Sequence, residues 1–161
     1  MKNKVVIITG ASSGIGKACA LQFGKAGTKL VLAARSKDKL MAFVNELNNK
    51  GMEAIGVVTD VSQEEQCQNL IEKAKEAYGR IDVMLNNAGI SMRALFKDVD
   101  LSVLKQVMDI NFWGTVYCTK YALDEIIKNK GSVIGISSIA GYKGLPGRTA
   151  NNGTFVFYDF I

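Results

Sequence analysis

The chain has 161 residues, enough for one domain with a sizeable core, and its 48% apolar and 22% charged residues are ordinary for a globular protein. The net charge is +5, but the basic residues are scattered, so we do not expect a nucleic-acid partner. Histidine is absent and the three cysteines lie far apart, so we expect no metal site. No apolar run is long enough for a signal-peptide core or a membrane span, which predicts a soluble, cytoplasmic protein.

Five short apolar runs predict strands that are buried on both faces of a sheet, at residues 5–9, 30–34, 54–58, 81–85 and 132–136. Helical periodicity is found at residues 14–27, from Ser36 (a predicted N-cap) to about Gly51, from a capping box at 62–65 to Gly79, and from about Leu101 to Asn129. Strands that alternate with helices indicate βαβ units. The sequence therefore predicts an α/β fold, a doubly wound parallel sheet with strand order 3-2-1-4-5.

The first strand ends in the loop TGASSGIG at residues 9–16, and a predicted helix follows at once. In such a loop Gly10 permits a tight turn, Gly14 lets a pyrophosphate approach the backbone, and Gly16 allows close packing of the helix on the strand. The amino end of the helix then offers N–H groups and a positive dipole to the phosphates. We predict a nucleotide-binding site formed by Gly10, Ser12, Ser13, Gly14, Ile15 and Gly16.

The end of the second strand indicates which dinucleotide binds. A site for NAD needs an Asp or Glu about 20 residues beyond the loop to bond the ribose 2′-OH. The chain has Ala34-Arg35-Ser36 at this place, and the guanidinium of Arg35 suits a 2′-phosphate. Ser13 and Lys17 are expected to assist it. We therefore predict NADP as the cofactor, with NAD less favoured; the alternative for Arg35 is a solvated surface charge.

Further motifs follow the later strands. Asp60-Val61 follows the third strand, Asn86-Asn87-Ala88-Gly89 follows the fourth, Asn111 lies in the fourth helix, and GISSIAG at 135–141 follows the fifth. With the glycine loop, these motifs resemble the classical branch of the short-chain dehydrogenase/reductase family over residues 1–150. The resemblance implies a Rossmann-like domain, hydride transfer between NADP(H) and a small carbonyl or alcohol substrate, and intact relatives that form homo-oligomers.

The resemblance also implies roles for individual residues. Cofactor contacts are implied for Asp60, Val61, Asn86, Asn87, Ala88 and Gly89. Of these, Asp60 is expected to bond the adenine amino group. The implied catalytic residues are Asn111, which holds a water in a proton relay, and Ser138, which bonds the substrate oxygen. From the residue types alone, the alternatives are that Asp60 caps a turn and that Ser138 is a strand-end hydroxyl.

One part of the family's catalytic set is missing from the sequence. The family's proton donor is a Tyr four residues before a Lys on one helix face, where the ammonium lowers the pKa of the phenol. None of the five tyrosines has a Lys at this spacing, and the positions expected for the pair are Asn151 and Phe155. We therefore expect residues 151–161 to be a divergent tail and not a separate domain, the chain to be truncated before the end of the domain, and its dehydrogenase activity to be impaired.

Further expectations follow from this difference. In the strand at 132–136, Ile134 and Ile136 lie on one side and Val133 on the other. Without the later part of the family domain, part of this apolar surface is expected to be exposed. The alternative function is a non-catalytic NADP(H)-binding protein, or a dimerisation partner that pairs through the fourth helix. A methyltransferase is disfavoured by the motifs at 86–89 and 135–141.

Overall fold

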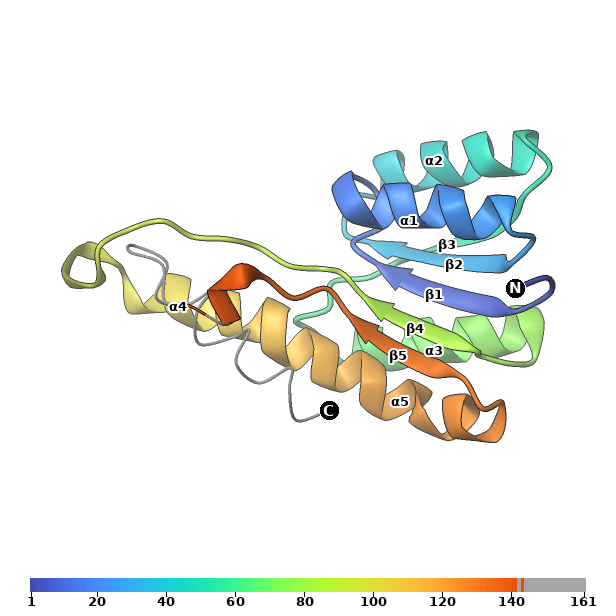
Figure 1. The fold of residues 1–161 in the computed structure, drawn as a ribbon. Helices are drawn as coiled ribbons and strands as arrows, with labels where there is room; N and C mark the ends of the chain where they lie inside the picture. Colours follow the sequence, from blue (N-terminus) through green and yellow to red (C-terminus); the bar gives the residue numbers. More distant parts are fainter. Residues whose placement is uncertain (142, 144–161) are drawn as a thin grey trace.

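The computed structural model describes residues 1–141 and 143, which form a parallel sheet with helices on both faces (Figure 1). The strands are β1 (Val5–Thr9), β2 (Lys29–Ala34), β3 (Glu53–Val58), β4 (Val83–Asn86) and β5 (Ser132–Gly135). Their order in the sheet is β3-β2-β1-β4-β5, which confirms the predicted fold class and strand order. The predicted boundary between residues 150 and 151 lies outside the described residues.

The α-helices of the described residues are α1 (Gly14–Lys25), α2 (Lys37–Asn49), α3 (Glu64–Tyr78), α4 (Leu101–Met108) and α5 (Gly114–Lys128). The long helix predicted from residue 101 is present, but a π-helical turn, η2 (Asp109–Trp113), divides it into α4 and α5. Such turns are rare and often occur at functional sites. Short 3-10 turns lie at η1 (Phe96–Asp98) and η3 (Ile139–Gly141). None of the described helices is both long and apolar enough to cross a membrane.

The helix ends agree only in part with the predicted signals. The residue that precedes α3 is Gln63, not Ser62, and it makes no side-chain capping bond. Ser62 instead donates its hydroxyl to Asp60 Oδ1 at 2.8 Å, so the predicted capping box is wrong. Gly79 ends α3 in the left-handed conformation, with φ of 70°, as its position predicted. Ser36 is the N-cap of α2, again without a side-chain bond.

Helices α1 and α2 cover one face of the sheet, and α3 and α5 cover the other (Figure 1). Alternate residues of β1 pack on opposite faces of the sheet. Val6 and Ile8 belong to the core under α1 and α2, whereas Val5 and Ile7 belong to the core under α3 and α5. All four side chains are fully buried. A central strand of a parallel sheet is buried on both faces, which explains the continuous apolar run at its position.

The face that carries α1 and α2 is covered only in part. Val133 of β5 packs against the core under α3 and α5, but Ile134, which points the other way, is 37% exposed. Within residues 1–141 and 143, no helix lies over β5 on that side. The expected apolar exposure beside β5 is therefore present at Ile134.

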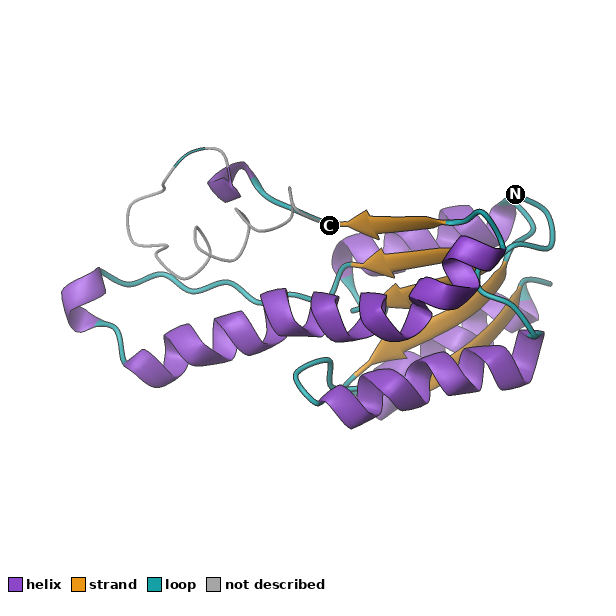
Figure 2. Ribbon diagram, turned by 90° about the horizontal axis from the view of Figure 1, so that it is seen from below, coloured by secondary structure: helices purple, strands orange, loops and turns teal. Residues whose placement is uncertain are grey.

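Residues 90–113 extend beyond the carboxyl edge of the sheet, and we call this segment the arm (Figures 1 and 2). A small apolar cluster centred on the buried Met92 and Val107 holds its extended part against α4. Leu95, Phe96 and Leu101, which lie in and beside η1, are 58%, 66% and 72% exposed. The arm is therefore an extension with little core of its own.

At the opposite, amino edge of the sheet, the buried carboxylate of Asp82 joins two segments. It accepts hydrogen bonds from Lys4 Nζ at 2.8 Å, from the Val5 N–H at 2.9 Å, and from the Arg80 guanidinium at 2.6 and 2.8 Å. Burial acts to raise the pKa of Asp82, but the hydrogen bonds from Arg80, Lys4 and Val5 outweigh it and lower the pKa to about 2. The carboxylate thus ties the start of β1 to the segment before β4.

Candidate functional site

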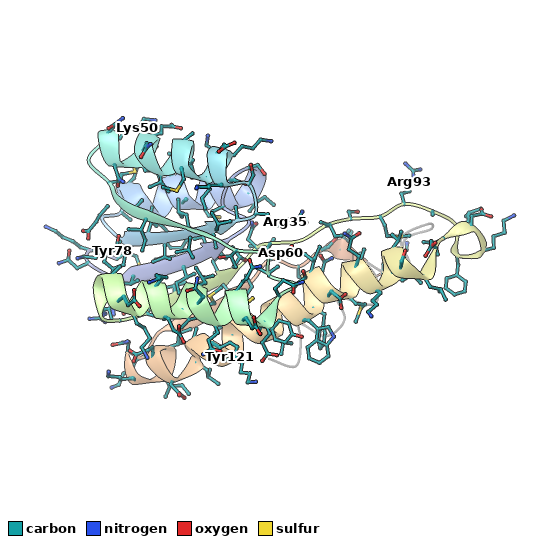
Figure 3. The ribbon with its side chains drawn as sticks, turned by 180° about the vertical axis from the view of Figure 1, so that it is seen from behind. Arg35, Lys50, Asp60, Tyr78, Arg93 and Tyr121 are labelled. Carbon is teal, nitrogen blue, oxygen red and sulfur yellow. The ribbon has the colours of Figure 1, made fainter. Side chains whose placement is uncertain are left out.

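A cavity of about 1030 Å³ opens at the carboxyl ends of the strands, where β1 and β4 are neighbours and the order of the strands reverses. Its wall contains the predicted site residues Gly10, Ser12, Ser13, Gly14, Ile15, Arg35, Asp60, Val61, Asn87, Ala88, Gly89, Asn111 and Ser138. Three residues of the predicted set, Gly16, Lys17 and Asn86, lie outside the wall. Figure 3 shows Arg35 and Asp60 at this end of the sheet. The fold therefore brings loops after all the strands into one cavity.

The glycine loop between β1 and α1 has backbone angles that residues with a side chain rarely adopt. Gly10 and Gly14 have φ angles of +63° and +53°. A Cβ on Gly10 would lie 2.8 Å from Asn87 Nδ2 and 2.9 Å from Ala88 Cα, so the loop approaches the end of β4 too closely for a side chain. A Cβ on Gly14 would meet nothing within 4 Å, because this part of the loop faces the open cavity.

Helix α1 starts directly from this loop. Its N-cap, Ser13, has an extended backbone and makes no side-chain capping bond, so Ser13 leaves the amino end of the helix uncapped. Gly16 is buried, and a Cβ there would lie 2.5 Å from both Asn87 Nδ2 and Gly10 O. Gly16 thus packs the helix against the loop and does not face the cavity.

Thr9 and Asn87 connect the ends of β1 and β4. Thr9 Oγ1 accepts the N–H groups of Asn87 and Ala88, both at 3.0 Å, and donates to Leu85 O at 3.4 Å. The Asn87 amide in turn donates to Thr9 O at 2.9 Å and to Gly10 O at 3.2 Å. Thr9 was not among the predicted site residues. Its signal in the sequence was a hydroxyl at the last position of an otherwise apolar strand.

Two cationic residues lie in the wall beside Ser36. Arg35 directly follows β2, and Lys39 lies in the first turn of α2. Both are exposed, and neither forms an ion pair with a carboxylate of residues 1–141 and 143. Lys39 was not predicted as a site residue, because nothing in the sequence distinguishes it from the other lysine near the start of this helix.

Lys17, which was expected to assist Arg35, lies outside the cavity wall. Its Nζ is 3.6 Å from Glu46 Oε2 and 4.6 Å from the centre of the Phe43 ring, both on α2. Glu46 also accepts a hydrogen bond from Lys50 at 2.6 Å, and the pKa of Glu46 is lowered mainly by this bond. The side chain of Lys17 thus joins α1 to α2.

Asp60 lies in the wall and also shapes the loop after β3. Its Oδ1 accepts the Ser62 N–H at 3.0 Å and the Ser62 hydroxyl at 2.8 Å, and its backbone N–H donates to Gln66 Oε1 at 2.8 Å. The turn-capping role considered from the sequence is therefore present together with a place in the cavity. Among the described residues, no three His, Cys, Asp or Glu side chains form a group that could hold a metal ion.

Asn111 lies in the π turn η2 and is almost fully buried, at 2% exposure. Its side-chain amide pairs with both backbone groups of Ile90: Oδ1 accepts the N–H at 2.8 Å, and Nδ2 donates to the carbonyl at 3.0 Å. The Thr115 hydroxyl donates to the Asn111 carbonyl at 3.1 Å. The amide therefore holds the segment after β4 against the π turn, at the edge of the cavity.

Ser138 lies three residues after β5, in the same wall as Asn111. Its hydroxyl oxygen accepts the Ala140 N–H at 3.3 Å, and its carbonyl accepts the Gly141 N–H at 3.0 Å. The side chain is half-buried. These bonds fix the turn that presents the hydroxyl, which keeps a proton to donate.

A sequence model described as short chain dehydrogenase matches residues 4–152. The chain belongs to this family. Among curated relatives, the protein named dehydrogenase/reductase SDR family member 7B, from Xenopus laevis, is 40% identical over 168 residues, which cover 98% of this chain and 52% of that protein. The 11-beta-hydroxysteroid dehydrogenase-like 4A of Arabidopsis thaliana is 37% identical over 148 residues, covering 91% and 50%. This short-chain dehydrogenase thus spans about half the length of these relatives.

Solved structures of the family have the same fold. A short-chain dehydrogenase/reductase from Burkholderia phymatum, in complex with NAD, superposes with a TM-score of 0.95 at 30% identity and covers 98% of this chain and 57% of that one. An alcohol dehydrogenase from Thermococcus sibiricus, complexed with 5-hydroxy-NADP, gives 0.93 at 29% identity and covers 96% and 66%.

None of the described tyrosines of this short-chain dehydrogenase lines the cavity. Tyr121 donates its hydroxyl to Glu64 at 2.7 Å, which raises the pKa of Tyr121. The Tyr78 hydroxyl is buried without a hydrogen-bond partner among the described residues, and burial, with a contribution from Glu53, raises the pKa of Tyr78 to about 12. The third described tyrosine is Tyr117, and the remaining two, Tyr142 and Tyr158, lie outside the described residues. The positions expected for the Tyr–Lys pair, Asn151 and Phe155, also lie outside them.

Proposed function

We propose that this chain forms the NADP(H)-binding part of a short-chain dehydrogenase/reductase that transfers a hydride between NADP(H) and a carbonyl or alcohol carbon of a small molecule. One observation carries the proposal: a single cavity wall contains the glycine loop, Arg35, Asn111 and Ser138. Family membership supports the reaction class, and the similar structures that contain NAD and 5-hydroxy-NADP support a nicotinamide dinucleotide.

The residues of the wall fit such a dinucleotide. The open space at Gly14 and the amino end of α1, which Ser13 leaves uncapped, suit a pyrophosphate. Asp60 keeps its second carboxylate oxygen for the adenine amino group, because the hydrogen bonds from Ser62 involve only Oδ1. A volume of about 1030 Å³ also fits a large cofactor.

When bound, the nicotinamide ring supplies or accepts the hydride, and the protein must orient the substrate and move a proton. We assign the Ser138 hydroxyl to the substrate oxygen, since Ser138 is held in the wall by its turn. Asn111 is assigned to the proton relay, where its bonds to Ile90 fix its place beside the cavity. Val61, Asn87, Ala88 and Gly89 complete the cofactor wall in this proposal.

Two arguments favour NADP over NAD. The end of β2 has no acidic residue to bond a ribose 2′-OH, and Arg35 lies in the wall without an ion pair among the described residues. A guanidinium binds phosphate through parallel hydrogen bonds, and it gains more from a 2′-phosphate than from a hydroxyl.

Turnover of this chain is proposed to be low. YxxxK does not occur in its 161 residues. Loss of a positioned general acid typically lowers a rate by about 10²–10⁴-fold. The proposed enzyme class therefore describes the family reaction, and cofactor binding is the part of it that these residues support.

Calorimetric titration of the 161-residue chain with NADPH and NADH tests the proposal. We expect NADPH to bind at least about tenfold more tightly, a difference of roughly 1.4 kcal/mol. Arg35→Asp should reverse the preference, because a carboxylate repels the 2′-phosphate and accepts the 2′-OH. Lys17→Gln is the control, since Lys17 lies outside the wall. Tighter binding of NADH by the unmodified chain would overturn the NADP assignment.

A second candidate is a non-catalytic NADP(H)-binding or dimerisation partner. It is favoured by the apolar side chains exposed along α4, η2 and α5, where Leu101, Trp113 and Ile127 are 72%, 43% and 66% exposed. Analytical ultracentrifugation of the chain, alone and with Trp113→Asp, tests pairing through this surface. A monomer over the whole concentration range would remove the dimerisation candidate.

A further inference from the structure

The wall of the cavity beside β2 carries two cations that have no anionic partner among the described residues. Residues 35–39 read RSKDK, with three cations and one anion. Arg35 and Lys39 line the cavity together with Ser36, whereas Lys37 and Asp38 do not. Neither Arg35 nor Lys39 has an ion-pair partner among residues 1–141 and 143. Two positive charges therefore share one wall without an ion-pair partner in the part of the chain that the structure describes.

The place of Lys39 is unfavourable for α2 itself. The amino end of a helix is the positive end of its dipole, so anionic side chains stabilise it and cationic side chains oppose it. Lys39 lies in the first turn, and the N-cap Ser36 adds no side-chain bond there. A dianion bound in the wall would reverse the sign of this interaction, because it would attract both the lysine and the helix end.

Lys17, which follows the glycine loop, already has contacts of its own. Lys17 lies against Glu46 and the Phe43 ring and is outside the wall. Moving its ammonium into the cavity would break both contacts. Lys39 has no such contact to lose among the described residues.

We propose that Lys39 is a specificity-determining residue that binds the 2′-phosphate of NADP(H) beside Arg35. The inference rests on the proposed function, because it adds a residue to the same site. Arg35 supplies parallel hydrogen bonds to two phosphate oxygens, and Lys39 supplies a compact charge on a flexible stem to the dianion. The alternative is that Lys39 is a solvated surface lysine, which would not change the affinity for NADP(H) relative to NAD(H).

Adenosine 2′,5′-bisphosphate and adenosine 5′-monophosphate isolate this end of the cofactor, because they differ only in the 2′-phosphate and lack the nicotinamide. Calorimetry with both probes should be done on the full chain and on Lys39→Gln. We expect the variant to bind the bisphosphate about tenfold more weakly and the monophosphate within about twofold of the parent. Lys37→Gln is the matched control: it removes the same charge from the same helix turn, at a residue outside the wall.

The outcomes separate the two proposals. If the parent chain binds both probes equally, the NADP assignment fails, and this inference fails with it. If the parent prefers the bisphosphate and Arg35→Ala removes the preference, but Lys39→Gln behaves like Lys37→Gln, only the role of Lys39 is overturned. Lys39→Arg should restore most of the affinity, and thermal melts of each variant show whether the fold is intact.

Discussion

Thr9 and Asn87 are joined by two hydrogen bonds, since the Thr9 hydroxyl accepts the Asn87 backbone N–H at 3.0 Å and the Thr9 carbonyl accepts the Asn87 side-chain amide at 2.9 Å. The end of β1 and the end of β4 thereby form one unit. Gly10 and Ala88 follow these residues directly, so both sides of the cavity have their positions fixed before any ligand binds. A preformed wall lowers the ordering cost of binding a cofactor.

The Thr9→Val substitution tests this connection. Valine keeps the shape of threonine but leaves the N–H groups of Asn87 and Ala88 without their acceptor, so we expect a loss of about 1–3 kcal/mol in the free energy of unfolding. Urea denaturation measures the loss. Thr28→Val is the matched control, because the buried Thr28 hydroxyl has no hydrogen-bond partner among the described residues and its removal should cost nothing. Equal effects of the two substitutions would contradict the role of Thr9.

Stability should fall in acid through Asp82. Its pKa is about 2 in the folded chain, below the ordinary 3.8, so its contribution is present above 3.8 and is lost as the pH falls through 3.8 towards 2. The contribution is about 2 kcal/mol. Urea denaturation at pH 6 and pH 3 should show a smaller change for Asp82→Asn than for the parent, whereas the exposed Asp124→Asn should follow the parent. If Asp82→Asn left the pH dependence of the free energy of unfolding unchanged, the role of Asp82 would be ruled out.

The three cysteines should differ sharply in reactivity. Cys19 is half-buried, whereas Cys67 and Cys118 are fully buried. A hydrogen bond with Cys67 and burial together raise the pKa of Cys118, which disfavours the reactive thiolate. A chromogenic disulfide reagent should therefore modify one thiol quickly and the other two only after unfolding. Cys19→Ser should abolish the fast phase. Fast modification that persists in this variant would contradict the burial of Cys67 and Cys118.

The chain should show no reductase activity that depends on its own site. With NADPH and a panel of small aldehydes and ketones, we expect rates that Ser138→Ala leaves unchanged, because the Tyr–Lys pair is missing from the sequence. Binding of NADPH, measured on the same samples, shows that the protein is folded. A clear NADPH oxidation rate that is lost in Ser138→Ala would show that the chain has a working proton donor.

The strand order could be predicted because it follows from local patterns. The run Val5–Thr9 is apolar throughout, as a doubly buried strand requires, and the glycine loop marks the turn that follows it. The same periodicity gave one long helix from residue 101, because a π turn changes the backbone pairing without leaving a mark in the spacing of apolar residues. The bonds from Asn111 to Ile90 accompany this turn, and they link residues 21 positions apart.

The candidate site was harder to predict where the direction of a side chain decides whether the residue lies in the cavity wall. Lys17 and Lys39 are both lysines close to the loops of the cavity, and only the packing of α1 on α2 turns one towards Glu46 and leaves the other in the wall. Similarly, Ser62 had the right spacing for a capping box, but its hydroxyl donates a hydrogen bond to Asp60 instead. Sequence spacing identifies the loop that supplies a residue, and tertiary contacts decide where that residue points.

The pairing of Asn111 with Ile90 also bears on how the molecule opens. A single side chain satisfies both peptide groups of Ile90, so the amide proton of Ile90 can exchange with solvent only when this pairing is broken. The arm and the edge of the cavity would then unfold locally as one cooperative unit, distinct from the core under α1 and α2. Hydrogen exchange along residues 88–113 would report the integrity of the part of the cavity wall that contains Asn111, in the absence of any ligand.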